Sequence, residues 1–258
     1  MYINRLYYPY TKNGSLILIK GSKFFYLKNV LKKKNKDHII IFNGRGREYF
    51  CVIQEMKKFF TIIKIKKKLK ILETTLFLNV VQPTIKKKNF ENILKMSNEI
   101  GVYSFSPIMT KYTSYEYLLT NNKKYMIHLE KKIISSSEQC GRNNIMVLNK
   151  MKTIEKFCIE IKYISSIKIY LQPFSKNSFF DLFKIMNSRK EKIAKNKVFI
   201  IVGPEGGFSK EEIFLLQKSQ FTDYKLFNSI LCSETAMLSS VSIVLNLLHY
   251  RKKRIEKK

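Results

Sequence analysis

The sequence KVFIIVGPEGGFSKEE, residues 197–212, decides the fold of this chain. Its opening run, Val198–Val202, is apolar and rich in β-branched residues, which is typical of a buried strand. Glycine and proline end the strand at Gly203–Gly207, and Ser209 with Glu212 has the spacing of a capping box, a common start of a helix. The stretch therefore predicts a strand, a turn of bare backbone and a helix, and α/β proteins bind ligands in such crevices at strand ends.

The turn matches neither of the common phosphate-binding loops. No Gly-Lys-Ser or Gly-Lys-Thr follows it, as a Walker A motif requires, and the Gly-x-Gly-x-x-Gly spacing of dinucleotide-binding proteins is missing. Its glycines would let backbone amides approach a ligand closely. Taken alone, the turn is better explained as a plain chain reversal, so a functional interpretation depends on other segments.

Size and charge admit several kinds of protein. A chain of 258 residues with 45% hydrophobic residues can form one large or two modest domains. Its net charge of +30 favours an anionic partner, most simply a nucleic acid. The 42 lysines and 7 arginines are also consistent with a compositional bias spread over the whole surface, so the charge permits RNA binding without proving it.

Several other classes are disfavoured. The four cysteines form no Cys-x-x-Cys pair and histidine is scarce, so we expect no metal site. No basic start followed by an apolar stretch marks a signal peptide. The longest apolar stretch, residues 236–248, is shorter than the ~20 residues that cross a bilayer. We expect a cytoplasmic protein with reduced thiols and no membrane partner.

The first 70 or so residues resemble a small β-barrel. The turn sequence Asn43-Gly44-Arg45-Gly46 predicts a hairpin, and a short helix is expected between Ser22 and Leu31. The expected strands are Arg5–Tyr8, Ser15–Ile19, His38–Phe42, Glu48–Ile53 and Phe59–Ile63.

Strands and helices alternate after the lysine-rich segment Lys64–Lys70, which predicts an α/β domain with a mostly parallel sheet. The expected strands are Thr75–Val81, Ile167–Leu171, Lys197–Val202 and Tyr224–Phe227. The expected helices are Asn89–Ile100 with Gly101 as its stop, Asn121–Cys140, one from Ser209, and Glu234–Tyr250.

Three further segments join the turn at Gly203–Gly207. They are NEIGV at 98–102, SEQCGRN at 137–143 and ILCSETA at 230–236. Together with residues 201–209, and in this order, they closely resemble the bacterial 16S ribosomal RNA uridine N3-methyltransferase family of the SPOUT superfamily. The N-terminal part is similar as well, at residues 29–31, 37–39, 42–44 and 48–49.

The resemblance implies a two-domain enzyme. It implies a PUA-like β-barrel that binds RNA in residues 1–72 and a trefoil-knotted methyltransferase domain with a mostly parallel sheet in residues 73–258. It also implies S-adenosylmethionine as methyl donor, and a homodimer whose active site lies near the subunit interface. The substrate would be a uridine near the 3′ end of small-subunit rRNA, as free rRNA or in the assembled subunit. Deep knots are rare, so this one is expected from the resemblance alone.

By the resemblance, three loops cradle the cofactor, at residues 171–173, 203–207 and 226–231. Four positions depart from the family, since Phe227, Asn228, Ser229 and Cys232 replace its usual Gly, Pro, Arg and Arg; Met96 also replaces a usual Lys. The expected cofactor-binding residues are Leu171, Gln172, Pro173, Gly203, Pro204, Glu205, Gly206, Gly207, Leu226, Phe227, Ile230, Leu231 and Glu234.

Uridine N3 carries a proton at neutral pH, so methylation needs a base or an environment that stabilises the uridine anion. Glu138 and Arg142 are the candidates, four residues apart and on one helical face if the helix continues that far. Arg142 would hold a phosphate or the anion on a uracil oxygen; a surface ion pair is an equally good explanation. Two other functions stay open: a catalytically silent RNA-binding or ribosome-assembly factor, and a related methyltransferase with another RNA target.

Overall fold

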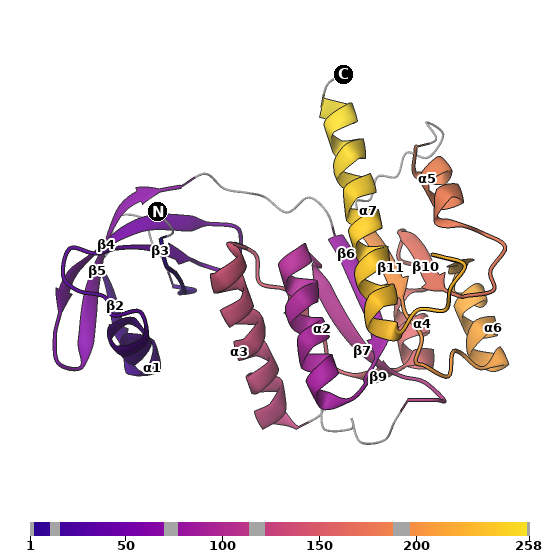
Figure 1. The fold of residues 1–258 in the computed structure, drawn as a ribbon, viewed down its shortest axis with the longest axis horizontal. Coiled ribbons are helices and arrows are strands. Elements are labelled where there is room, and N and C mark those ends of the chain that lie inside the picture. Colours follow the sequence, from indigo (N-terminus) through magenta and orange to yellow (C-terminus); the bar gives the residue numbers. More distant parts are fainter. Residues whose placement is uncertain (1–2, 11–15, 70–76, 114–121, 188–196, 257–258) are drawn as a thin grey trace. The chain divides into compact units, whose positions relative to one another are not determined.

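The computed structural model describes residues 3–10, 16–69, 77–113, 122–187 and 197–256. The chain divides into two compact units (Figure 1). The first comprises Met1–Thr74 with Ile134–Ile145, and the second Thr75–Ile133 with Met146–Lys258. The first unit thus includes Ile134–Ile145 as well as the N-terminal segment. The domain division at residues 72 and 73 stays a prediction.

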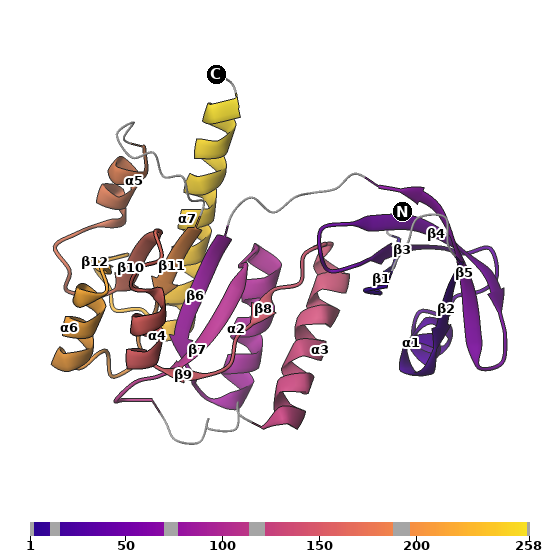
Figure 2. The ribbon, with the colours of Figure 1, turned by 180° about the vertical axis from the view of Figure 1, so that it is seen from behind.

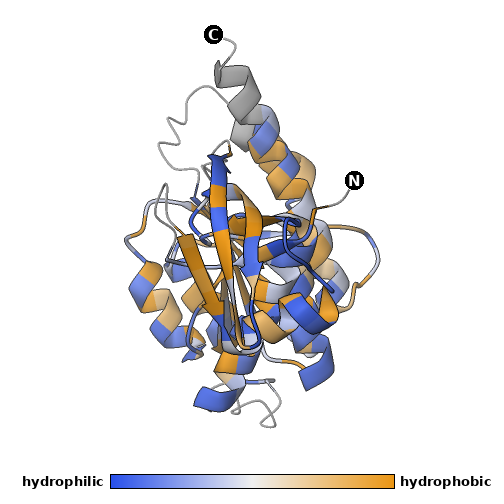
Figure 3. Ribbon diagram, turned by 90° about the vertical axis from the view of Figure 1, so that its left-hand side faces the viewer, coloured by the Kyte–Doolittle hydropathy of each residue, from blue (hydrophilic) through white to orange (hydrophobic). Residues whose placement is uncertain are grey.

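The first unit is a curled five-stranded sheet in the order β1-β3-β4-β5-β2. Neighbouring strands are antiparallel except β1 and β3, which are parallel. Buried residues alternate with more exposed ones along residues 16–20 and 48–53, as expected for a sheet with one buried face, although some of the strands are hydrophobic along most of their length (Figure 3). The hairpin expected at Asn43 is present, since Asn43 N–H donates to the Arg47 carbonyl at 3.0 Å. The strands are β1 (Arg5–Tyr7), β2 (Leu16–Lys20), β3 (His38–Phe42), β4 (Glu48–Met56) and β5 (Phe60–Lys68).

A short helical segment fills the hollow of this sheet. It begins as α1 (Gly21–Phe25) and continues as a π-helical turn, η1 (Tyr26–Val30). Phe24 and Leu27 are fully buried and join the core formed by the inward residues of the strands. The expected β-barrel is thus present as a curled, open sheet with β1 and β2 at its edges, and the helical segment packs against its inward face.

The second unit is built on a parallel sheet in the order β12-β10-β11-β6-β7-β8, with β9 also paired to β7. Every pairing among its described strands is parallel, which confirms the expected α/β class. The strand expected at Tyr224–Phe227 was placed too late, because Thr222–Tyr224 pairs with β10 instead. The strands are β6 (Phe77–Pro83), β7 (Ser104–Met109), β8 (Val147–Leu148), β9 (Lys152–Thr153), β10 (Ile167–Leu171), β11 (Lys197–Ile201) and β12 (Thr222–Tyr224).

Helices cover both faces of this sheet (Figures 1 and 2). Helices α2 (Lys87–Ile100) and α7 (Ser233–Glu256) lie on one face, and α4 (Ile154–Ile161) and α6 (Lys210–Lys218) pack on the other. Helix α5 (Phe179–Asn187) lies near α7. No helix of the described residues is long and apolar enough to cross a membrane.

Local signals in the sequence account for two helix ends. Gly101 ends α2 in a left-handed conformation, with φ of 107°. At the start of α6, Ser209 and Glu212 form the expected capping box, each side chain accepting the other residue's backbone N–H. Helix α3 (Lys123–Cys140) occupies most of the expected range Asn121–Cys140, of which Asn121 lies outside the described residues.

Candidate cofactor site and catalytic residues

A cavity of about 300 Å³ lies at the carboxyl ends of β10 and β11. Its walls come from the three loops that follow β10, β11 and β12, which are the loops that the family resemblance assigns to the cofactor. The expected residues that line it are Leu171, Gln172, Pro173, Gly203, Pro204, Glu205, Gly207, Ile230 and Leu231. Val202, Phe208, Cys232, Ser233 and Ala236 complete the lining.

The turn at Gly203 is tightly packed. Gly207 N–H donates to the Pro204 carbonyl at 2.9 Å, and Gly207 has a φ of 72°, which favours glycine. A Cβ atom on Gly203 would stand 3.0 Å from the Phe208 ring. The glycines therefore serve this geometry as well as the access of a ligand to the backbone.

Ser233 fastens the turn to the start of α7. Its hydroxyl donates to the Gly203 carbonyl at 3.1 Å and accepts from the Gln82 amide nitrogen, at the end of β6, at 2.7 Å. Gln82 is fully buried and Ser233 nearly so. The sequence did not single out either residue as part of the site. The only signal for Ser233 was its place in the ILCSETA segment.

Four of the expected cofactor residues do not line the cavity: Gly206, Leu226, Phe227 and Glu234. A Cβ atom on Gly206 would lie 3.2 Å from Cβ of Tyr112, outside the cavity wall. Phe227 is 49% exposed, so its bulk does not fill the cavity. Glu234 lies in the first turn of α7, where a carboxylate complements the helix dipole, and accepts from Asn89 Nδ2 at 2.8 Å.

The cavity suits a flat, mostly neutral ligand with a few polar edges. Its volume lies at the lower end of the range for small-molecule sites, ~300 to 1,000 Å³. Ile230 and Leu231 make no hydrogen bond with any described residue, so their backbone donors and acceptors are available to a bound ring. Leu171, Val202 and Ala236 supply apolar surface, and Glu205 a carboxylate.

The predicted catalytic residues Glu138 and Arg142 belong to the first unit, and neither lines the cavity. Tyr7 N–H donates to the Glu138 carboxylate at 2.9 Å, which fastens the end of α3 to β1. Burial raises the pKa of Glu138 above its ordinary value, against the opposing effects of that hydrogen bond and of Lys23 and Arg5. Burial lowers the pKa of Arg142 to about 10, so its side chain stays positively charged at neutral pH.

Arg5 ties the same segment to the barrel. One guanidinium nitrogen of Arg5 forms an ion pair with Glu48 at 2.7 Å, and another donates to the Asn143 side chain and to the Arg142 carbonyl. Both Arg5 and Asn143 are buried. The SEQCGRN segment is therefore held by polar contacts inside the first unit, a role that its sequence did not reveal.

Models of two protein families match consecutive parts of the chain. An RNA methyltransferase PUA domain matches residues 19–71, and an RNA methyltransferase domain matches residues 72–245. Relatives named ribosomal RNA small subunit methyltransferase E match over nearly the full length. The protein from Buchnera aphidicola subsp. Schizaphis graminum is 33% identical over 93% of this chain and 94% of its own. The protein from Rickettsia conorii is 26% identical over 95% of this chain and 96% of its own.

Solved structures agree with this assignment. A putative methyltransferase from Legionella pneumophila, solved in complex with the cofactor SAM, has a TM-score of 0.83 at 26% identity, covering 95% of this chain and 98% of its own. Ribosomal RNA small subunit methyltransferase E from Neisseria gonorrhoeae, bound to S-adenosyl methionine, also has a TM-score of 0.83, with the same coverage and 19% identity. This chain therefore belongs to the RNA methyltransferase family of the ribosomal RNA small subunit methyltransferase E proteins, and its fold is the knotted SPOUT fold preceded by a PUA-like domain.

Proposed function

We propose that this chain transfers a methyl group from S-adenosylmethionine to N3 of a uridine near the 3′ end of 16S rRNA. The observation that carries the proposal is the cavity at the ends of β10 and β11, built by the loops that the family resemblance assigns to the cofactor. The names of the relatives support the rRNA substrate, and the Legionella structure supports the cofactor. The choice of uridine N3 rests on the resemblance of the motifs.

The residues that line the cavity fit this cofactor. The backbone of Ile230 and Leu231 would bind the adenine edge, with Leu171 and Ala236 against its ring. The turn at Gly203–Gly207 would hold the methionine part, with Glu205 facing its amino group. When bound, S-adenosylmethionine supplies a methyl group already activated by its sulfonium, so the chain's main task is to place the nucleophile in line with it.

We assign the activation of uridine to Arg142, with Glu138 as a positioning residue. Loss of the N3 proton leaves a negative charge on the uracil, which a nearby guanidinium stabilises. Burial lowers the pKa of Arg142 to about 10, so its guanidinium stays charged at neutral pH, as this role requires. Glu138 holds the helix end that precedes Arg142 through the Tyr7 N–H.

The remaining expectations complete the proposal. The barrel of residues 1–72 would bind rRNA by its lysines and by the exposed Arg45, because phosphate contacts position an RNA without reading its sequence. Residues 73–258 would carry the transfer. We further propose a cytoplasmic homodimer, since Phe174, Phe227 and Ile230, in or beside the loops that line the cavity, are 82%, 49% and 73% exposed.

The decisive experiment has two stages. Calorimetric titration with S-adenosylmethionine should show saturable binding, and small ribosomal subunits from cells lacking the protein should then gain an N3-methyluridine, identified by mass mapping of the 16S rRNA. Methylation of another nucleotide would overturn the proposed target but would still support a methyltransferase activity.

The altered segment Phe227–Cys232 favours one rival function, a catalytically silent RNA-binding or ribosome-assembly factor on the same fold. Its Ser and Cys cannot replace the family's arginines in contacts to an anion. Absence of binding at millimolar S-adenosylmethionine would favour this rival over the enzyme.

A further inference from the structure

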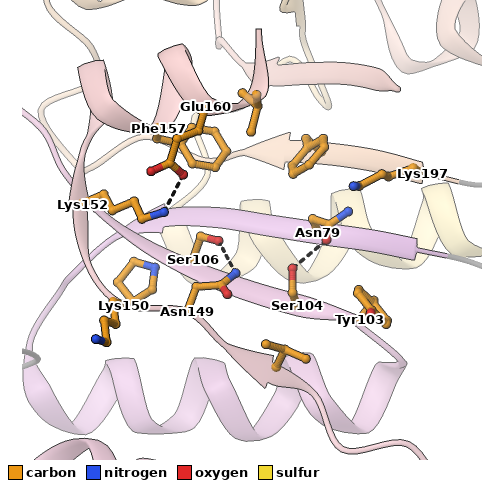
Figure 4. Close-up of a pocket in the computed structure, with 14 residues that line it drawn as sticks. Asn79, Tyr103, Ser104, Ser106, Asn149, Lys150, Lys152, Phe157, Glu160 and Lys197 are labelled. Atoms are coloured by element: carbon orange, nitrogen blue, oxygen red, sulfur yellow. Dashed lines mark hydrogen bonds and ion pairs between the residues drawn. The ribbon is translucent and has the colours of Figure 1, made fainter. Parts of the chain in front are cut away.

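A second cavity, of about 310 Å³, lies over the amino-terminal halves of β6, β7 and β11 (Figure 4). It shares no lining residue with the cavity at the carboxyl ends of the strands. The two cavities therefore occupy different ends of the same sheet, and the proposed transfer does not use this one.

The cavity lies where one face of the sheet is polar, at the beginning of strands whose later residues on that face are apolar. Alternate residues of a strand share a face. Near the strand ends this face carries the buried apolar residues Val81, Ile108 and Ile201, which α4 and α6 cover. Earlier on the same strands and the same face stand Asn79, Ser104 with Ser106, and Lys197. Helix α4 covers this polar part only at its border, through Phe157 and Ile161.

The charge of the cavity is positive. Lys150, Lys152 and Lys197 line it, together with the single carboxylate of Glu160. Lys152 Nζ pairs with Glu160 at 2.5 Å, whereas Lys150 and Lys197 have no acidic partner within the described ranges (Figure 4). The ionic groups thus leave two uncompensated positive charges, which favour an anion and disfavour a metal cation.

The floor of the cavity is polar and has spare hydrogen-bonding capacity. Ser104 Oγ donates to Asn79 Oδ1 at 2.6 Å, and Asn149 Nδ2 donates to Ser106 Oγ at 2.8 Å. These bonds orient the side chains. Asn149 Oδ1 accepts no hydrogen bond from the described residues, and the Ser106 hydroxyl proton has no acceptor among them, so each can bind a ligand.

The walls are aromatic. Phe157 and Phe199 pack edge to face, with ring centroids 6.1 Å apart, and Tyr103 lies at the other side of the opening (Figure 4). A purely inorganic anion would make no contact with these rings, and an uncharged ring would make no ion pair with the lysines. A phosphorylated group joined to a flat heterocycle uses both, because bases stack on aromatic side chains and lysines bind phosphate.

We propose that this cavity binds a nucleotide whose base lies against the aromatic wall and whose phosphate is bound by Lys197, beside Phe199, while Lys150 at the opposite end of the cavity is open to a second phosphate (Figure 4). The nucleotide is either a unit of an RNA strand or a free mononucleotide. The inference does not depend on the proposed methyl transfer, because the cofactor cavity is separate.

The test uses the full chain and calorimetric titration with uridine 5′-monophosphate. We expect saturable binding that a Lys150→Gln, Lys197→Gln double variant weakens about tenfold or more, because charge-assisted hydrogen bonds to phosphate are lost. Lys156→Gln is the matched control, since Lys156 is exposed on α4 and does not line the cavity. Binding of S-adenosylmethionine should be the same in all three proteins, which separates this proposal from the proposed function.

Two further ligands decide the details. Ribose 5-phosphate lacks the base and should bind about tenfold more weakly, since stacking of a base contributes ~1 to 3 kcal/mol; equal affinity would reduce the site to an anion site and overturn the proposal. A five-residue oligouridylate that binds more tightly than the mononucleotide supports an RNA strand, and equal or weaker binding supports a free nucleotide. The proposal is also overturned if neither uridine 5′-monophosphate nor the oligouridylate binds at millimolar concentration, or if the double variant binds them as the wild type does.

Discussion

The hydroxyl of Ser233 donates a hydrogen bond of 3.1 Å to the carbonyl oxygen of Gly203. Thirty positions separate the two residues along the chain, and the bond joins the turn after β11 to the first residue of α7. Gln82, fully buried at the end of β6, donates to the same hydroxyl. One side chain thus sets the distance between two walls of the candidate cofactor cavity.

We expect Ser233→Ala to weaken S-adenosylmethionine binding about tenfold and to lower the free energy of unfolding by ~1 to 3 kcal/mol. The substitution frees the turn and leaves the buried Gln82 amide without its acceptor. Calorimetry and denaturant unfolding measure the two effects. Ser233→Thr keeps the hydroxyl and should restore both, and Ser242→Ala, on the exposed side of α7, is the control. If Ser233→Ala left the affinity unchanged, the hydrogen bond from Ser233 to Gly203 would have no role in binding the cofactor.

Gly206→Val should weaken S-adenosylmethionine binding about tenfold or more. A Cβ atom at this position would lie 3.2 Å from Tyr112 Cβ, so the added side chain displaces the turn that lines the cavity. The effect is indirect, because Gly206 itself does not line it. Adding Tyr112→Gly, which removes the Cβ atom of this half-exposed residue, should recover most of the affinity in the same titration. Wild-type affinity in the single variant would contradict our placement of the cofactor.

Phe227→Gly should change the affinity for S-adenosylmethionine by no more than about twofold to threefold. Phe227 is 49% exposed and does not line the cavity, and substitutions at such positions have small effects. Leu231→Gly, in the same loop but at the cavity wall, should weaken binding about tenfold, because it removes an apolar contact to the ligand. A large gain of affinity in Phe227→Gly would mean that the departure from the family's glycine impairs this chain.

The parts of the fold predicted from sequence are those with local causes. The apolar run before Gly203, the capping box at Ser209 and the helix stop at Gly101 each lie within a few residues, and all three are present. Strand β7 was missed because Ser104–Met109 contains two serines and a proline, although it is paired on both sides, with β6 and with β8 and β9. Strand β12 was misplaced because Asp223, at its centre, is a residue type that is depleted in strands.

The long-range parts could not be predicted in this way. Gln82 and Ser233 meet across 151 positions, and the second cavity assembles side chains from separate strands and loops. Neither leaves a periodic pattern. The knot likewise depends on how the chain is threaded, so only the resemblance of ordered motifs could indicate it. That resemblance also named Gly206 and Phe227, which the structure places outside the cavity wall.

Arg142→Gln should lower kcat at least about a hundredfold and leave the dissociation constant of S-adenosylmethionine unchanged. Removing one group that stabilises a developing anion typically has this effect on rate, and Arg142 does not contact the cofactor cavity. Arg45→Gln, at an exposed arginine of the barrel, should raise KM for the small subunit and keep kcat. Single-turnover methylation with labelled donor separates the two. A wild-type kcat in Arg142→Gln would exclude the assigned role.

Glu138→Gln should change how stability depends on pH. Burial raises the pKa of Glu138 above 4.5, so between the ordinary and the raised pKa the folded chain binds more protons than the unfolded chain. The contribution of Glu138 is therefore complete below the ordinary pKa and is lost as pH rises through the raised one. Glutamine does not titrate, so the free energy of unfolding of the wild type minus that of the variant should fall across this window.

Denaturant unfolding at intervals from about pH 4 to pH 8 measures this difference, which amounts to ~1.4 kcal/mol for each unit of pKa displacement before solvent screening reduces it. Glu130→Gln, exposed on the same helix, shows what losing a carboxylate without the Tyr7 contact does. Burial lowers the pKa of Lys23, against the opposing effect of Glu138. A difference that instead rises with pH would mean that the Tyr7 hydrogen bond, Lys23 and Arg5 outweigh burial, and that Glu138 is held as a stabilised carboxylate.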